Sequence, residues 1–206
     1  MPRTKQQTEQ IRAESREKIL ITARRLFAEK GYDGCNVSDI AREAGMSQGN
    51  IYWYFPSKKE IFLAVLMDGF TLLGEVMSRA ASGPGTAAEK MGAFLNDYFA
   101  LMKDKGGEEF VSIVVTFIAQ GGVEHFADFG ISTRQIGAGY HQSLNAIFTQ
   151  GQQEGVVTSG IDPNQLSMYF FALTNGLMLM YPEEWKEIPK ETLHRTILRL
   201  VGMNPA

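Results

Sequence analysis

Residues 36–58 read NVSDIAREAGMSQGNIYWYFPSK, and this stretch predicts one helix, a tight turn and a second, shorter helix. Asn36 is a residue type preferred at helix N-caps. Asp39 suits the first helical turn, where an acidic side chain faces the positive end of the helix dipole. The first helix is therefore predicted to begin at about Val37. Gly45 is predicted to end it, because glycine readily adopts the positive φ that a helix stop requires.

The second helix of this stretch is predicted to begin after Ser47, whose hydroxyl can cap it. Within it, only Ile51 and Phe55 form an apolar stripe. The other side chains face away from that stripe: Gln48, Gly49, Asn50, Tyr52, Trp53 and Tyr54. Two helices joined by a short turn with glycine, the second polar or aromatic on its outer face, are typical of a helix-turn-helix. That arrangement places its second helix in the major groove of DNA.

The surrounding sequence resembles the TetR family of transcriptional regulators. The resemblance runs from roughly Lys18 to Val65, carried by ILITARRLFAEKGYDG and then VSDIAREAGMSQGNIYWYFPSKKEIFLAV. It implies an all-α protein with an N-terminal three-helix DNA-binding domain, followed by a larger helical domain for ligand binding and dimerisation. It also implies a regulator, most often a repressor in this family, that binds a palindromic operator as a homodimer. The DNA affinity of such a regulator is changed by a small molecule.

The outward side chains of the second helix are the candidates for DNA contact. Gln48 and Asn50 suit base edges, because amides can pair bidentately with adenine. Tyr52 and Tyr54 suit phosphate or sugar, and Lys58 adds positive charge toward phosphate. The full predicted DNA-binding set is Asn36, Ser47, Gln48, Gly49, Asn50, Tyr52, Trp53, Tyr54 and Lys58. The alternative for these side chains is a solvated or packed helix face, and Trp53 suits packing as well as it suits contact.

Residues 45–49 also match G-x-S-x-G, the nucleophile elbow of serine hydrolases. That elbow requires a buried strand leading into the serine. The preceding residues instead carry Asp39, Arg42 and Glu43 at spacings that suit an amphipathic helix. We therefore predict that Ser47 is a helix cap and that the chain is not an enzyme. A serine hydrolase using Ser47 is the first alternative function, and an architectural DNA binder without an effector is the second.

Composition fits a soluble globular protein, with 206 residues, 44% hydrophobic and 21% charged. Residues 1–60 contain 11 Lys or Arg and 8 Asp or Glu, whereas residues 61–206 contain 9 and 15. The positive part of the chain therefore coincides with the predicted helix-turn-helix. The lone cysteine, Cys35, excludes an intrachain disulfide and favours a reducing cytoplasm. The N-terminus lacks the apolar run of a signal peptide, and Leu166–Tyr181 is too short to span a membrane, so no membrane partner is predicted.

Apolar residues at helical spacing predict an all-helical architecture with three parts. These parts are a disordered arm over residues 1–11, a helix-turn-helix domain over residues 12–60 and an effector-binding and dimerisation domain over residues 61–206. The run FVSIVVTFIA, residues 110–119, could alone be a buried strand. We predict a helix there, because no second strand pattern lies nearby to pair with it. Trp185 is predicted to lie in an acidic loop.

The segment Asn164–Tyr181 is apolar on both of its sides, so it must be covered on both. One small domain can cover one side, and a second copy of the chain is predicted to cover the other across a two-fold axis. With the preceding helix this gives a four-helix interface. The predicted interface residues are Tyr140, Leu144, Phe148, Phe170, Leu173 and Leu177.

The second domain is rich in aromatic and methionine side chains. Most such residues are core, but a subset can line an apolar cavity that suits a small hydrophobic effector. The candidates for contact with this ligand are Phe94, Tyr98, Phe99, Met102 and Phe117. The three histidines are far apart in the sequence and no nucleotide-binding motif is complete, so no metal or cofactor is predicted.

Overall fold

The structure is a computed structural model that describes residues 5–121, 125–158 and 160–203. In these residues every regular element is a helix, which confirms the predicted all-α class. The β structure there is limited to an isolated bridge between Val157 and Met203. The helices are, in chain order, α1 (Lys5–Gly34), α2 (Val37–Ala44), α3 (Gln48–Tyr54), α4 (Lys58–Ser82), α5 (Ala87–Lys103), α6 (Lys105–Gly121), α7 (His125–Asp128), α8 (Thr133–Gln153), α9 (Pro163–Met180), α10 (Pro182–Glu187) and α11 (Lys190–Leu200).

Several helix starts are set by capping side chains. Thr86 and Glu89 cap α5 reciprocally: Thr86 Oγ1 accepts from Glu89 N at 3.3 Å, and the Glu89 carboxylate accepts from Thr86 N at 2.8 Å. The hydrogen bond from the Thr86 backbone lowers the pKa of Glu89. The Asp162 carboxylate accepts from Asn164 N at 2.9 Å and caps α9. Helix α6 contains FVSIVVTFIA, so the prediction of a helix there is confirmed.

Helix α1 begins earlier than the sequence predicted. Residues 5–11 are helical, whereas the prediction placed them in a disordered arm. The reason is that Lys, Gln and Glu are good helix formers even without an apolar face. In addition, the Gln10 amide donates to the Glu14 carboxylate at 2.9 Å, one turn further along.

Trp185 lies in helix α10 and not in the predicted loop. The proline at the first helical position and the glutamates of the first turn are typical of a helix start. The Trp185 side chain is buried, and its ring centroid lies 5.3 Å from that of Phe99 in α5. The loop prediction failed because the acidic residues were interpreted as solvated, although they also favour a helix N-terminus.

The chain divides by packing into two compact units. Unit 1 comprises Met1–Gly69 and Glu108–Gly130, and unit 2 comprises Phe70–Gly107 and Ile131–Ala206. Helices α4 and α6 therefore contribute residues to both units. Residues 108–130 pack with the N-terminal helices, although they follow them by some forty residues in the sequence. The functional boundary predicted after residue 60 stays a prediction.

The core of unit 1 is a cluster of aromatic rings from four helices, α1, α4, α6 and α7, and the turn after α7. Phe62 of α4 contacts Phe27 of α1 at 5.1 Å and Phe117 of α6 at 4.9 Å between ring centroids. Phe117 in turn contacts Phe129, just after α7, at 5.0 Å. Gly69 lets the Phe110 ring approach α4, because a Cβ at this position would lie 2.2 Å from a ring carbon. Helices α6 and α7 thus complete the core under the helix-turn-helix.

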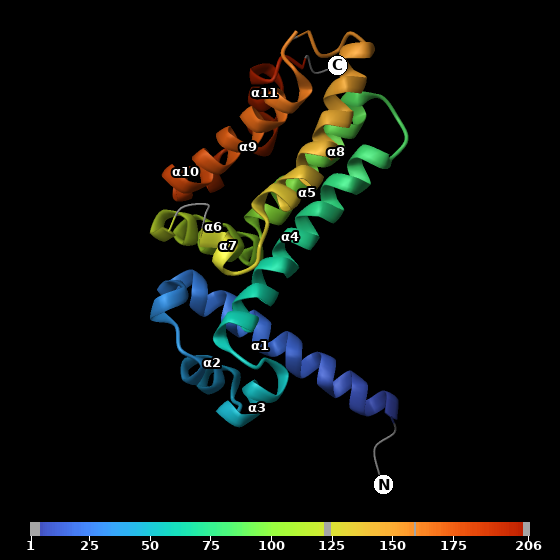
Figure 1. The fold of residues 1–206 in the computed structure, drawn as a ribbon. Coiled ribbons are helices and arrows are strands. Elements are labelled where there is room, and N and C mark those ends of the chain that lie inside the picture. The colour runs from blue at the N-terminus through green and yellow to red at the C-terminus, as the bar shows by residue number, and fades with distance from the viewer. Residues whose placement is uncertain (1–4, 122–124, 159, 204–206) are drawn as a thin grey trace. The chain divides into compact units, whose positions relative to one another are not determined.

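The core of unit 2 is built on α5, α8 and α9. Figure 1 shows α8 running alongside α5, and the two helices are in contact. Phe94 of α5 and Phe170 of α9 lie 5.4 Å apart between ring centroids, and both are fully buried. Gly151 of α8 lies against Val157, so that a Cβ there would be 2.5 Å from a valine methyl carbon.

Among the described helices, α4 alone is long and apolar enough to cross a membrane. This is weak evidence, because core helices of soluble proteins meet the same criteria of length and hydropathy. Several of the apolar side chains of α4 are buried, including Phe62 in unit 1 and Met77 in unit 2.

Candidate nucleic-acid interface

The turn between α2 and α3 has the geometry that the sequence predicted. Gly45 adopts the left-handed conformation, with φ 63° and ψ 38°. Its N–H donates to Arg42 O at 3.1 Å, and Met46 N donates to Ala41 O at 2.9 Å. Ser47 Oγ then accepts from Asn50 N at 3.1 Å and caps α3. The predicted helix stop and the predicted second cap are both confirmed.

Helix α3 packs through one narrow face only. Ile51 is completely buried and Phe55, just after the helix, is nearly so. The remaining side chains of α3 are exposed or, for Tyr54, half-buried: Gln48, Gly49, Asn50, Tyr52, Trp53 and Tyr54. The outer face of α3 is therefore available to an external partner, and it consists of amide and aromatic groups.

Asn36 occupies the N-cap position of α2 with extended backbone, but its side chain makes no capping hydrogen bond. Asp39 does not cap the helix either. Its carboxylate accepts from Arg42 at 2.8 Å and from Lys30 at 3.3 Å. These two hydrogen bonds lower the pKa of Asp39. The predicted start of α2 is right, but the predicted capping bonds are replaced by ion pairs.

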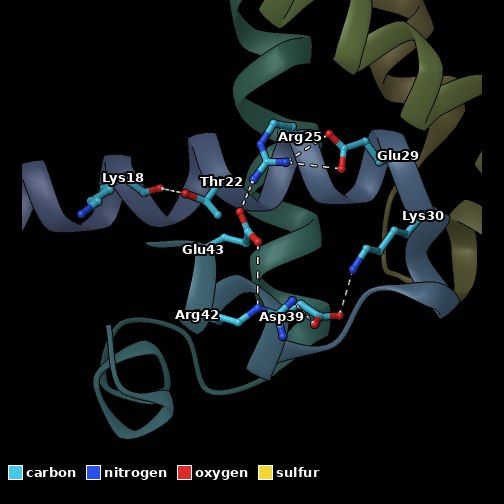
Figure 2. A network of polar contacts seen from close by, with 8 residues as sticks. All are labelled: Lys18, Thr22, Arg25, Glu29, Lys30, Asp39, Arg42 and Glu43. Atoms are coloured by element: carbon cyan, nitrogen blue, oxygen red, sulfur yellow. Dashed lines mark hydrogen bonds and ion pairs between the residues drawn. The ribbon is translucent and has the colours of Figure 1, made fainter. Parts of the chain in front are cut away.

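A network of ion pairs fastens α2 to α1 (Figure 2). Arg25 of α1 donates to Glu43 of α2 at 2.9 Å and to Glu29, one turn along its own helix, at 3.1 Å. The hydrogen bond to Glu29 contributes most to the raised pKa of Arg25. Near the other end of α2, the Lys30 ammonium of α1 pairs with the Asp39 carboxylate at 3.3 Å. Figure 2 shows the two attachments at successive positions along α1, so that α2 is held at both ends.

Lys58 is engaged inside unit 1. Its ammonium donates to the carbonyl oxygen of Tyr32 at 2.8 Å and lies 4.3 Å from the centre of the Tyr32 ring. The neighbouring Lys59 donates to Asp128 O at 2.8 Å and lies over the Phe129 ring. Both lysines thus hold the start of α4 against the ends of other helices. The predicted phosphate contact by Lys58 stays a prediction, and this internal hydrogen bond competes with it.

Ser47 lacks the setting of a nucleophile elbow. The residues before it form helix α2 and a short turn, where an elbow needs a strand. Its hydroxyl oxygen is used as the acceptor of the α3 cap. The described residues also contain no group of three or more His, Cys, Asp or Glu side chains that could hold a metal ion.

The five predicted ligand-binding residues are all buried, but they do not lie together. Phe94, Tyr98, Phe99 and Met102 belong to α5 in unit 2, whereas Phe117 belongs to the aromatic cluster of unit 1. The prediction grouped them because helical spacing shows which face of a helix is apolar, but not which neighbour covers that face.

Unit 2 also holds buried polar groups that the sequence analysis missed. Tyr98 Oη donates to Thr174 Oγ1 at 3.2 Å, and burial raises the pKa of Tyr98 to about 12. Ser167, also fully buried, donates to Asn145 at 2.6 Å. Ser167 and Thr174 are seven residues apart on α9, so two hydroxyls at heptad spacing in an apolar helix were the available signal.

Two histidines of unit 2 have buried ring nitrogens. Nδ1 of His141 and Nε2 of His194 make no hydrogen bond within the described part of the chain. The ring centroids of His194 and Phe99 lie 5.5 Å apart, and burial lowers the pKa of His194. These nitrogens are the candidates for the polar groups that orient a ligand in an otherwise apolar site.

The predicted dimer interface stays a prediction, and its residues differ in how deeply they are buried within the chain. Leu144, Phe148 and Phe170 are fully buried within the chain itself, so they do not lie on an outer face. Tyr140 is only half-exposed, and its hydroxyl donates to Phe70 O at 2.6 Å. Leu173 and Leu177 are half-buried. The exposed side of α9 and the residue after it is instead formed by Met168, Tyr169, Leu179, Met180 and Tyr181.

The described geometry defines a helix-turn-helix protein whose second helix has an exposed outer face. Residues 19–65 match the family described as bacterial regulatory proteins, tetR family. The chain is 30% identical over 184 residues to the fatty acid metabolism regulator protein of Bacillus subtilis strain 168, covering 89% of this chain and 91% of that relative. It therefore belongs to the TetR family of transcriptional regulators.

Other relatives and solved structures agree with this assignment. The HTH-type transcriptional repressor AcnR of Corynebacterium glutamicum is 41% identical over 64 residues, which cover 31% of this chain and 34% of AcnR. The crystal structure of the regulator FadR from Bacillus subtilis in complex with stearoyl-CoA has a TM-score of 0.70 and 25% identity, covering 90% of this chain and 97% of that one. PfmR from Thermus thermophilus, at 23% identity, has the same fold with a TM-score of 0.70, covering 88% of this chain and 97% of that one.

Proposed function

We propose that this regulator is a homodimeric repressor that binds a palindromic operator through α3 and is released by a ligand with a long acyl chain. The observation that carries the DNA-binding part is the exposed outer face of α3. Helix α3 follows a left-handed glycine turn and packs on the rest of the unit only through Ile51 and Phe55, so its outer face is open to a partner. Gln48 and Asn50 on this face would contact base edges. Tyr52, Trp53 and Tyr54 would contact the sugar and phosphate backbone.

The exposed side of α9 supports the dimer. Met168, Leu179 and Met180 are each about half exposed or more, on a helix without a charged residue. A second copy related by a two-fold axis would cover this side with the same apolar surface. The two copies of α3 would then enter successive major grooves, about 34 Å apart.

The similarity to the Bacillus subtilis regulator supports the ligand class. That regulator matches nearly the whole chain, and a solved FadR structure from the same organism contains stearoyl-CoA. Unit 2 offers a suitable interior, because its core is aromatic and contains a few polar atoms such as Tyr98 Oη and His194 Nε2. An acyl chain needs the apolar surface, and a thioester or headgroup needs the polar atoms.

The coupling between ligand and DNA would operate as a linked equilibrium. Helix α4 contributes residues to both compact units, so a displacement of one end can be transmitted along a continuous helix. Suppose that the effector prefers the arrangement that cannot bind DNA. It then weakens DNA binding, and DNA weakens effector binding by the same factor. The same proposal places the protein in the cytoplasm, with Ser47 as a cap and no catalytic role.

The test uses the full-length protein in two stages. Duplexes are first selected from a random pool, and enrichment of one palindromic sequence is the expected result. Stearoyl-CoA is then titrated into the protein with and without the selected duplex, with acetyl-CoA as the control that keeps the headgroup and lacks the chain. We expect stearoyl-CoA to bind more weakly in the presence of the duplex and acetyl-CoA not to bind. Recovery of no preferred sequence would reject the operator, and equal affinities in the two titrations would reject the coupling.

A further inference from the structure

Two arginines of α1 lie over aromatic rings at and next to the recognition helix. The guanidinium carbon of Arg12 is 5.0 Å from the centre of the Trp53 ring, and that of Arg16 is 5.3 Å from the centre of the Phe55 ring. The arginines are four residues apart, so they occupy one face of α1. Figure 1 shows the N-terminal turns of α1 extending beyond α2 and α3, and most of their side chains are exposed.

These arginines differ from the other described arginines of unit 1 in what they contact. Arg24 pairs with Glu109 at 2.9 Å, Arg25 with Glu43 at 2.9 Å, and Arg42 with Asp39 at 2.8 Å. In the described part of the chain, Arg12 and Arg16 have no carboxylate partner and no hydrogen bond. The positive charge of Arg24, Arg25 and Arg42 is therefore paired with a carboxylate, whereas among the described residues that of Arg12 and Arg16 is not.

The N–H groups of Arg12 are available for a further contact, because no hydrogen bond to the described residues uses them. A guanidinium attracted to a ring by its charge keeps donors for another partner. The guanidinium fork matches the paired oxygens of a phosphate. Trp53 is 60% exposed and lies on the side of α3 away from the buried Ile51, so Arg12 borders the face that would enter the groove.

We infer that Arg12, held by the Trp53 indole, is a phosphate-binding residue that makes α1 a second DNA-contacting element beside the helix-turn-helix. This inference rests on the proposed DNA-binding function. The occupant is the phosphodiester backbone next to the groove that receives α3, because the free edge of Arg12 is cationic and planar. The indole fixes the guanidinium before binding, so less side-chain entropy is lost when the phosphate arrives. Arg16, which lies over the nearly buried Phe55 ring, is the next residue in the same row.

The test is the salt dependence of DNA binding by the full-length protein. Wild type and Arg12→Gln are titrated by fluorescence anisotropy with the selected operator and with a 40-bp duplex of random sequence (about four helical turns), across a range of KCl concentrations. Loss of one phosphate contact should reduce the slope of log K against log salt by about 0.9 for each bound protomer on both duplexes. The same relation predicts affinity about fivefold weaker per protomer at 0.15 M salt.

Three variants separate this role from simple packing. Arg24→Gln removes the same charge from α1 but takes it from an arginine paired with Glu109, outside the network that fastens α2, so its slope should equal that of wild type. Arg12→Lys keeps a point charge and should retain the slope while weakening binding, because the planar stack is lost. In a Trp53→Ala background, Arg12→Gln should reduce the slope by less than half as much as in wild type, since the guanidinium is no longer held.

An unchanged slope in Arg12→Gln, with wild-type binding intact, would overturn the inference and leave the proposed function standing. The inference would also fail if Arg24→Gln reduced the slope as much as Arg12→Gln, because general charge would then explain the effect. Wild-type protein that binds neither duplex would reject the proposed function itself, and the inference with it.

Discussion

Helices α3 and α9 both present large apolar side chains to the surroundings, but the groups around those side chains differ. On α3, the exposed Tyr52 and Trp53 lie among the amides Gln48 and Asn50, and the Arg12 guanidinium lies over the indole ring. On α9, the exposed methionines and leucine lie on a helix with no charged residue from its first to its last position. Exposed apolar surface marks both helices as binding surfaces. The polar groups beside it distinguish the two partners that we propose, nucleic acid for α3 and a second apolar face for α9.

The largest effect is expected from a charge placed on the outer face of α9. Leu179→Arg would bury an unpaired charge in the proposed dimer interface, at a cost of about 3 to 5 kcal/mol. The protein should become monomeric in sedimentation velocity, and operator affinity should fall on the order of 100-fold or more. The matched control is Leu200→Arg on α11, where the wild-type side chain is also exposed. If both variants stayed dimeric, the proposed self-association would involve another surface.

The next effect tests whether α3 recognises bases. Asn50→Ala should lose discrimination of about 1 to 3 kcal/mol at particular base pairs, because an amide that contacts a base edge is removed. The salt slope should not change, since no phosphate contact is lost. Repeated selection from a random pool measures the base preference, and titration across KCl concentrations measures the slope. A loss of equal size for every sequence would show that Asn50 contacts the backbone instead.

A third prediction concerns the buried phenol of unit 2, for contrast with the exposed tyrosines of α3. Tyr98→Phe removes the hydrogen bond to Thr174 and should lower the free energy of unfolding by about 1 kcal/mol at pH 8. The pKa of Tyr98 is raised to about 12 in the folded protein, above the ordinary value of 10.0. The folded state therefore keeps the phenol proton up to a higher pH than the unfolded state does. As a result, the free energy of unfolding of the wild type falls as the pH rises from 10 toward 12.

The Tyr98→Phe variant lacks that titration, so its deficit against wild type should shrink above about pH 10 in chemical denaturation experiments. Tyr52→Phe, on the exposed outer face of α3, is the control for loss of a phenol that lies outside both the core and the proposed dimer interface. A deficit for Tyr98→Phe that stayed constant between about pH 8 and 11 would mean that Tyr98 ionises as easily in the folded chain as in the unfolded one.

The smallest effect is expected at Lys58, which borders the DNA-binding region but donates inward. Lys58→Gln should lower stability by about 1 kcal/mol, because the carbonyl of Tyr32 loses its donor. The salt slope of DNA binding should stay at the wild-type value. Lys18→Gln, an exposed residue of α1, controls for the charge change alone. A reduced slope without loss of stability would support the phosphate contact that the sequence predicted for Lys58.

The parts of the fold that sequence predicted well are those set by neighbouring residues. Gly45 and Ser47 fix the turn before α3 through their own backbone and hydroxyl, so their roles follow from residue type and spacing. The interface residues on α8 and α9 depend on which side of an all-apolar helix the rest of the chain covers. Phe170 and Leu179 look alike in sequence, yet one is fully buried and the other is exposed. Only tertiary packing distinguishes them.

Long-range contacts explain why other residues lie in surroundings that the sequence pattern did not indicate. Phe117 lies in a helix that the sequence assigned to the second domain, but its ring packs in unit 1 against Phe62. Lys58 matches a phosphate-binding position by residue type, but the carbonyl that it contacts is 26 residues away in sequence. The contact of Arg12 with Trp53 was not predicted. Residues 5–11 were expected to be disordered, so Arg12 was placed at the first turn of its helix and no contact with α3 was considered.

The split composition of unit 1 has a consequence for how the protein is made. Its N-terminal segment ends at Gly69, but the ring of Phe62 is covered by Phe117 and Phe129 from the later segment that ends at Gly130. About 60 more residues must therefore leave the ribosome before this core can close, which takes roughly 3 to 12 s at ordinary rates of translation. During that interval the nascent DNA-binding half exposes an unfinished aromatic surface. A fragment cut after Gly69 would keep that surface permanently, so the DNA-binding half cannot be transplanted as one contiguous piece.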